Sequence, residues 1–442
     1  MRSPRAPARA HFSGSAAALA AAAVLLAPGA AAAPPPCEPT YGDVQAAVLA
    51  SALKLLDAGG KPIPGTPADD SAQPPAGDPP KPPKPEDENR RREVCRNIET
   101  APKVIAVQPG ITVVATTSFM ATLSGRLDSV RGQGAAAGNL MTSTTPPDGL
   151  MGLGARNKDR TPPPGPASPF TIYAMGSFLG GRRAEAPNLL GFDYESGSAT
   201  VGIEYSVNRN LILGLAANYT GSNADVNGGA TVDVSAIQGA AYLSYATRAW
   251  FLDLLAAYGT HDLDMTRPGL PDPILGSTSG NALALAVRAG YLFDFGGVRA
   301  GPIAGLTYVR SRIDGYTEKG DPQLTLTVSS LTIDSLAGSV GIRFLAPFRA
   351  GSTLVVPYLN ITLEHQFGDL DQVLTASLTS APALPPILST FAAFDARDFG
   401  KIEGGLTLEL GPDFSASLSG AHTFGRDESY DFRISAGLNY RF

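Results

Sequence analysis

The stretch YDFRISAGLNYRF, residues 430–442, decides the fold because its side chains alternate strictly. The even-numbered residues, from Tyr430 to Phe442, are apolar, whereas the odd-numbered ones, from Asp431 to Arg441, are polar or glycine. Successive side chains of a β-strand point to opposite faces, so this period of two predicts a strand with one apolar and one polar face. Soluble sheets and membrane-spanning barrels both contain such strands, so features elsewhere in the sequence are needed to distinguish the two folds.

Residues 170–442 contain twelve alternating segments that are separated by turn residues. In the segment 210–221, for example, Leu213, Leu215 and Tyr219 share one face, and Gly214 and Asn218 lie on the other. Aromatic residues recur on the apolar faces near the segment ends, which is where the interfaces of a bilayer attract them. A soluble sheet has no reason to repeat that placement, so the pattern favours a membrane barrel.

The connections between these segments alternate between short and long. Residues 207–210 and 411–413 make short joins, whereas residues 261–280, 314–330 and 367–397 make long ones. Outer-membrane barrels have short periplasmic turns and long outer loops. An open sheet edge would leave unpaired backbone groups in hydrocarbon, so the barrel has to close. The sequence therefore predicts an all-β fold over residues 169–442, a 12-stranded antiparallel transmembrane barrel whose last strand pairs with its first.

The N-terminal part of the chain indicates export. Three arginines precede an apolar run at 16–27 and small residues at 31–33, which is the pattern of a cleaved signal peptide over residues 1–33. Cys37 and Cys95 are the two cysteines, and in an exported chain we expect them to form a disulfide; two free thiols are the alternative. The net charge of −6 and the lack of a basic patch argue against a nucleic-acid partner.

Two segments lie between the signal and the barrel. Residues 34–110 are Pro-rich, with predicted helices at 40–60 and 88–99, and we expect them to form a small disulfide-linked segment, a short passenger. Residues 111–168 are predicted to be a linker that begins with a helix, ITVVATTSFMATLSGRLDSVRG (111–132). The apolar run at 104–123 is interrupted by Gln108 and Pro109, so we do not expect it to cross a membrane as a helix.

Several stretches resemble the translocator β-domain of classical autotransporters, the proteins of type V secretion. They are AWFLDLLAAYGTHDLD (249–264), VRAGPIAGLTYVRSRIDGYTE (298–318) and SAGLNYRF (435–442), and SFMATLSGRLDSVRG (118–132) is similar to the pore helix of that family. The resemblance covers about residues 169–442. It implies a twelve-stranded barrel in the bacterial outer membrane, a helix in its lumen and an N-terminal passenger at the cell surface. It also implies that Tyr440 and Phe442 form the aromatic signal that the barrel-assembly machinery reads. The expected partners are outer-membrane lipid, this machinery and periplasmic chaperones, and the barrel is expected to be monomeric.

Charged residues on the polar faces are expected to point into the lumen. By parity these are Glu204, Asp253, Arg288, Arg343, Glu364, Glu403 and Arg433. They form either a hydrated, self-neutralising wall or a cradle for a helix that carries Arg126, Asp128 and Arg131, and both can hold. We expect residues 119–131 inside the pore, because a twelve-stranded barrel encloses more space than small inward residues fill.

The sequence offers little for catalysis. The three histidines that remain after signal removal, at 261, 365 and 422, all lie in the barrel tract. Gly42-Asp43 is followed by Val44, not by the serine of an esterase block. We therefore expect no enzyme activity and no catalytic, cofactor-binding or metal-binding residues. The expected function is to translocate or anchor a short N-terminal segment; the alternative is a non-secretory channel, structural protein or adhesin with a periplasmic segment.

Overall fold

The computed structural model describes residues 85–142 and 169–442, apart from 187, 271, 369, 370, 384, 395, 412 and 427, and without the side chains of 85–88, 90, 91, 95 and 132–142. Two helices come first, α2 (Pro85–Ile105) and α3 (Val107–Thr142). The strands of the barrel are β1 (Phe170–Arg183), β2 (Phe192–Ser206), β3 (Leu211–Val226), β4 (Ala230–Ala246), β5 (Trp250–Arg267), β6 (Ile274–Tyr291), β8 (Arg299–Ile313), β11 (Leu331–Leu345), β13 (Thr353–Gln366), β16 (Asp398–Glu409), β17 (Phe414–Phe424) and β18 (Tyr430–Arg441). Two short strands, β7 (Phe293–Asp294) and β12 (Phe348–Ala350), extend hairpins at the short turns.

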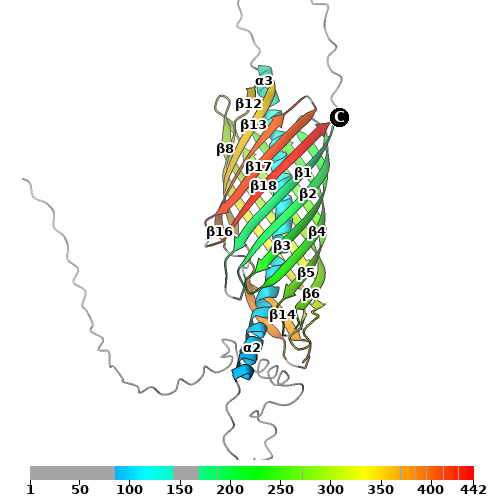
Figure 1. Cartoon of the computed structure of the whole chain (residues 1–442). Helices are drawn as coiled ribbons and strands as arrows, with labels where there is room; N and C mark the ends of the chain where they lie inside the picture. Colours follow the sequence, from blue (N-terminus) through cyan, green and yellow to red (C-terminus); the bar gives the residue numbers. More distant parts are fainter. Residues whose placement is uncertain are drawn as a thin grey trace, which may run out of the picture. The chain divides into compact units, whose positions relative to one another are not determined.

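The twelve long strands form a closed antiparallel barrel, which confirms the predicted fold (Figure 1). Each strand pairs with its neighbours in sequence order, and β8 pairs with β11. Closure is made by β1 and β18, which pair from Thr171↔Arg441 to Arg182↔Tyr430. The C-terminal stretch therefore finds its partner at the start of the barrel, and no long strand keeps a free edge.

An exposed apolar band surrounds the middle of the barrel. Leu215, Ile237 and Leu363 are 61%, 66% and 66% exposed, and they point outward from three different strands. Exposed Trp250 and Tyr291 lie beside the short turns at one edge of this band, where Trp250 packs on Tyr245 with ring centroids 5.1 Å apart. Exposure of so many apolar side chains to water would be unfavourable, so the band is the lipid-facing surface.

The alternation reverses toward the long-loop end, and one predicted boundary is wrong there. Residues 261–280 were expected to form a loop, but β5 and β6 continue through most of them and only 268–273 connect the two strands. In this part Leu263 and Met265 are buried inside, while Asp262 and Asp264 are exposed outside. Water outside the bilayer favours polar outward residues, so the hairpin rises above the apolar band with a core like that of a soluble sheet.

The predicted loops 314–330 and 367–397 contain a second sheet, which we call the loop sheet. Its strands are β9 (Tyr316–Thr317), β10 (Leu326–Val328), β14 (Asp371–Leu378) and β15 (Ile387–Ala392), in the order β15-β14-β10-β9. Leu326, Val328, Leu374 and Phe391 are buried on one of its faces and join the core at this end of the barrel. The loops are therefore folded around an apolar face and not only extended connections.

The helices begin earlier than predicted. The helix expected from Ile111 starts at Val107, and the short helix expected at 88–99 extends over the whole of α2. Pro109 lies in the first turn of α3, where a missing backbone N–H is tolerated. The predicted boundary between 110 and 111 thus falls inside α3, and the predicted helix at 40–60 lies outside the described residues.

The helical run Arg92–Arg131 is long and apolar enough to cross a membrane by length and composition. However, 78% of its most apolar window is buried inside the protein, and Ile105, Ile111, Phe119 and Leu123 are almost wholly inaccessible. Its apolar surface is therefore satisfied by the inside of the barrel, so these residues need no contact with lipid.

Two adjacent residues of β13 test the assignment of the faces. Ile361 points to lipid between Ile342 and Ile402, and Thr362 points to the lumen. Ile361→Arg is expected to lower the free energy of unfolding by about 2–4 kcal/mol, since an arginine in mid-bilayer is poorly solvated. Thr362→Arg is expected to cost less because its side chain enters a polar space beside Glu364. Urea titration followed by heat-modifiable gel migration measures both, and a costlier Thr362→Arg would reverse the assignment.

Candidate functional site

Helix α3 runs through the lumen from the loop end to the turn end of the barrel (Figure 1). At the loop end, Gln108 Nε2 donates a hydrogen bond of 2.9 Å to the hydroxyl of Tyr316. Midway, Gln238 Nε2 of β4 donates to Thr116 Oγ1 over 3.0 Å. Near the short turns, Arg131 reaches Asp253 of β5. The lumen is thus the candidate functional site, and the helix has a defined direction in it.

The first charged contact of the helix is the pair Arg126–Glu204. Arg126 donates from Nε to Oε1 over 3.1 Å and from Nη2 to Oε2 over 2.7 Å, and both side chains are buried. Tyr242 Oη donates to the same carboxylate over 3.0 Å, and the guanidinium lies 4.9 Å from the ring centroid of Tyr173. The bidentate pair and the further donor offset much of the cost of burying the two charges, although Arg126 Nη1 has no hydrogen-bond partner.

Glycine makes room for this contact. A Cβ at Gly214 of β3 would lie 2.1 Å from the Tyr242 ring, which no real contact allows. The ring therefore lies over the bare backbone of its neighbouring strand and points its hydroxyl at Glu204. This explains why small residues on the inward face matter for the site, although they carry no charge.

Five charged residues meet closer to the turn end than this pair. We call them the central charge cluster: Asp128, Arg131, Asp253, Arg288 and Arg343. Asp128, fully buried, contacts Arg131 and Arg343 and accepts a bond of 2.6 Å from Arg288 Nη2. Asp253, also fully buried, accepts from Arg131 Nη1 over 2.6 Å and from Arg288 Nη2 over 3.1 Å. Two carboxylates thus hold three guanidiniums, and helix and wall are joined by ion pairs.

The other predicted lumenal residues also lie inside the barrel, but they pair with side chains of the barrel strands and not with the helix. Glu403 forms ion pairs with Lys401 at 3.4 Å and Arg433 at 3.6 Å, and it faces Gly125 of the helix. Glu364 accepts a hydrogen bond of 2.7 Å from Thr362. The wall therefore serves both predicted roles: one part neutralises itself and another part binds the helix.

Sequence reasoning missed the uncharged polar residues of the site. Asn360 donates to Asp128 over 3.2 Å, and Ser244 donates to Asp253 over 2.7 Å. Tyr173, Tyr242 and Gln238 complete the lining. Each of them lies on the inward face of its strand, so the signal that could have found them was already present in the alternation.

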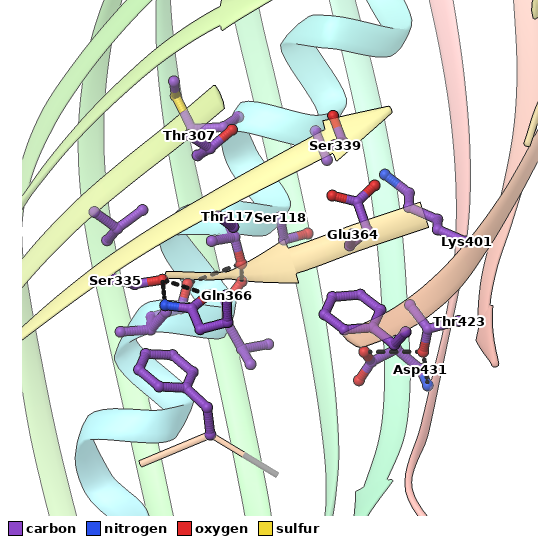
Figure 2. Close-up of a pocket in the computed structure, with 18 of the residues that line it drawn as sticks. Thr117, Ser118, Thr307, Ser335, Ser339, Glu364, Gln366, Lys401, Thr423 and Asp431 are labelled. Carbon is purple, nitrogen blue, oxygen red and sulfur yellow. Dashed lines mark hydrogen bonds between the residues drawn. The ribbon is translucent and has the colours of Figure 1, made fainter. Parts of the chain in front are cut away.

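A cavity of about 340 Å³ remains beside the helix (Figure 2). Thr117 and Ser118 of α3 face it, and Figure 2 shows Thr307, Ser335, Ser339, Glu364, Gln366 and Lys401 on the strands around it. Its lining combines hydroxyl groups and charged side chains of both signs with many apolar side chains, among them Val113 and Ile303. The helix therefore leaves part of the lumen open, and this part has both polar and apolar walls.

The remaining predicted residues divide between the turn end and the undescribed part. Tyr440 and Phe442 are exposed, with ring centroids 5.4 Å apart. Cys37 and the side chain of Cys95 lie outside the described residues, so their disulfide stays a prediction. In the described part of the chain, no group of three or more His, Cys, Asp or Glu is placed to hold a metal ion.

Comparison with solved structures gives the same fold. The translocator domain of the autotransporter NalP from Neisseria meningitidis superposes with a TM-score of 0.52 at 17% identity, over 75% of this chain and 99% of that domain. The β-domain of the Bordetella autotransporter BrkA matches at 15% identity with a TM-score of 0.46, over 62% of this chain and all of that one. At 17% identity the likeness to the NalP domain shows the fold alone.

Comparison of the sequence with known proteins also bears on the family of the chain. A protein of Pseudomonas putida, named "Uncharacterized protein in trpE-trpG intergenic region", is 27% identical over 263 residues, which are 56% of this chain and 43% of that protein. The chain thus spans less than half the length of that relative. The family model Autotransporter beta-domain matches residues 174–421, more than half of the chain. The protein therefore belongs to the autotransporter β-domain family and is an outer-membrane barrel of the translocator type.

Proposed function

We propose that the barrel carries its N-terminal segment through the outer membrane and anchors it at the bacterial cell surface. The direction of α3 carries this proposal. Its first residues contact Tyr316 at the loop end, and α2, which precedes it, contacts Pro268 of the β5–β6 loop. Outer-membrane barrels direct their long loops outward. The docked part of α2 therefore lies at the outer mouth in this orientation.

The other end of the helix supports the same direction. Arg131 binds Asp253 close to the short turn between β4 and β5, and the helix continues to Thr142. The barrel begins at Phe170, whose carbonyl accepts from the N–H of Phe442 over 3.2 Å at the same turn end. The end of α3 and the start of β1 thus both lie at the turn end, which faces the periplasm in this orientation.

Protease sites at two positions test the orientation. A site inserted between residues 84 and 85 is expected to be cut on intact cells, because it precedes the outer end of the helix. The same site between 150 and 151 is expected to resist until the outer membrane is permeabilised. Immunoblotting of both fragments measures this. A site at 84 that is protected on intact cells would contradict surface display and favour a periplasmic segment.

Three finer features belong to this proposal. Residues 1–33 act as a signal peptide, Tyr440 and Phe442 are read by the barrel-assembly machinery, and Cys37 bonds to Cys95. The disulfide would restrain the segment between the two cysteines by roughly 4 kcal/mol of chain entropy. The barrel acts by holding polypeptide and not by catalysis.

Mass spectrometry of the purified exported protein is expected to find an N-terminus near Ala33 and, in a non-reduced digest, a cross-linked pair of peptides that contain Cys37 and Cys95. Export exposes the thiols to an oxidising periplasm, which is the reason for the bond. Recovery of both cysteines as free thiols would contradict the disulfide, and retention of residues 1–33 would contradict the cleavage.

A second candidate function is passage of small polar solutes. The 340 Å³ cavity beside α3 has hydroxyl groups, Glu364 and Lys401 among its otherwise largely apolar lining, and these polar groups support a hydrated path past the helix. Steady conductance of the full chain at a level that admits solutes would favour this function. The helix-removal experiment in the Discussion separates the two.

A further inference from the structure

A second buried polar group lies at the loop end, away from the central charge cluster. Arg267 ends β5 and is 2% exposed, and Glu318 lies next to β9 and is 3% exposed. Arg267 donates from Nε to Oε1 over 2.8 Å and from Nη2 to Oε2 over 2.5 Å. The pair joins the barrel wall to the loop sheet, and the same carboxylate accepts the N–H of Leu326 over 2.7 Å.

A helix residue completes this group. The side-chain oxygen of Asn97 in α2 accepts a hydrogen bond of 2.7 Å from Arg267 Nη1. The amide nitrogen of the same side chain donates to the carbonyl of Pro268 over 2.7 Å. Asn97 is thus bonded in both directions to the barrel, and its loss would leave a guanidinium N–H and a carbonyl without these partners.

Apolar contacts surround the polar ones. Val94, Ile274 and Leu324 form a buried cluster on which Ile98 and Leu270 pack. Val94, Asn97, Ile98 and Ala101 are spaced as neighbours on one side of a helix. The docked face of α2 is therefore continuous, with a hydrogen-bonded centre and apolar flanks.

We infer that Asn97, Arg267 and Glu318 form a lock that holds α2 on the folded loops and so keeps α3 in the lumen. The helix cannot leave the mouth without breaking both bonds of Asn97 and exposing the apolar cluster. These contacts are the same whether the loop end faces the cell surface or the periplasm. The lock is therefore independent of the proposed surface display and adds to it. Asn97 acts here as a positioning residue for the helix.

Hydrogen exchange of the purified full chain in detergent tests the lock. Asn97→Ala is expected to speed exchange of the amides of residues 93–105 on the order of tenfold or more, because most of the stability of a helix in a protein comes from its tertiary packing, which an undocked α2 loses. Barrel-strand amides and heat-modifiable migration are expected to stay as in the wild type. Asn89→Ala, at an exposed position of the same helix, is the matched control and should leave α2 exchange unchanged. Equal exchange in the Asn97 variant and the wild type would overturn the lock.

A double-mutant cycle tests the coupling through Arg267. Glu318→Gln is expected to speed α2 exchange several-fold, although the hydrogen bonds of Glu318 go to Arg267 and Leu326. Once Asn97 is absent, the same change should add little, since coupled residues are non-additive. Independent, multiplying effects of the two substitutions would show that Glu318 does not act on α2 through Asn97 and would overturn the three-residue lock. Because orientation in a cell plays no part, this result is separate from that of the protease sites.

Discussion

A barrel that begins at Phe170 is expected to form large, stable pores in planar bilayers, whereas the full chain is expected to conduct little. A helix is about 10–12 Å across with its side chains, and barrel diameter grows with strand number, so α3 occupies most of a twelve-stranded lumen. The cavity that remains is only about 340 Å³. Conductance should therefore rise on the order of tenfold when the helix is removed.

Folding of the shortened barrel has to be verified by heat-modifiable migration, because removal of α3 also removes Arg126 from Glu204 and Arg131 from Asp253. An open lumen hydrates these carboxylates, so closure is expected to survive. Two equal, large conductances would show that α3 does not obstruct the pore. Two equal, small ones from folded barrels would place the restriction in the wall or the loop sheet.

Asp128→Asn is expected to lower the free energy of unfolding by about 3–5 kcal/mol, which is the usual cost of removing one partner of a buried ion pair. Asp128 is wholly inaccessible and neutralises part of the charge of Arg131, Arg288 and Arg343. Without it, one carboxylate of the cluster faces three guanidiniums. The change in the midpoint of urea unfolding, at constant slope, measures the effect.

The control is an ion pair on the surface. Asp193 and Arg182 lie 4.0 Å apart, with side chains 68% and 55% exposed. Asp193→Asn is expected to cost less than about 1 kcal/mol, because water and salt screen the pair. Equal shifts for the two variants would mean that the central charge cluster is hydrated and contributes little to stability.

The barrel and its two faces could be predicted because their signal is local. Every second residue of a strand shares a face, so parity alone places Glu204, Arg343 and Glu403 inside. The turn lengths and the aromatic ends then distinguish a bilayer from water. None of these inferences needs to know which strands are neighbours.

The loop end could not be predicted in the same way. At this end the strands extend beyond the bilayer into water. Apolar residues therefore point inward and polar residues outward, which is the reverse of the arrangement within the membrane. Asp262 and Asp264 were interpreted as a loop for this reason, although Leu263 and Met265 continue the strand inside. The start of α3 was missed because Gln108 and Pro109 resemble a helix break, yet Gln108 is satisfied by Tyr316 from a distant part of the chain.

The sequence by itself determined the strand number, the closure, the lipid face and the identity of the inward charges, because each follows from periodicity and solvent. Only the tertiary structure decided which charges meet. Parity says that Glu204 and Glu403 both point inward, but it does not give their height on a tilted strand or their angle around the barrel. The rotation of α3 turns Arg126 toward Glu204 and presents Gly125 to Glu403, which pairs with Arg433 instead. Such pairings depend on strand tilt and helix rotation together, and no local stretch of the chain contains either.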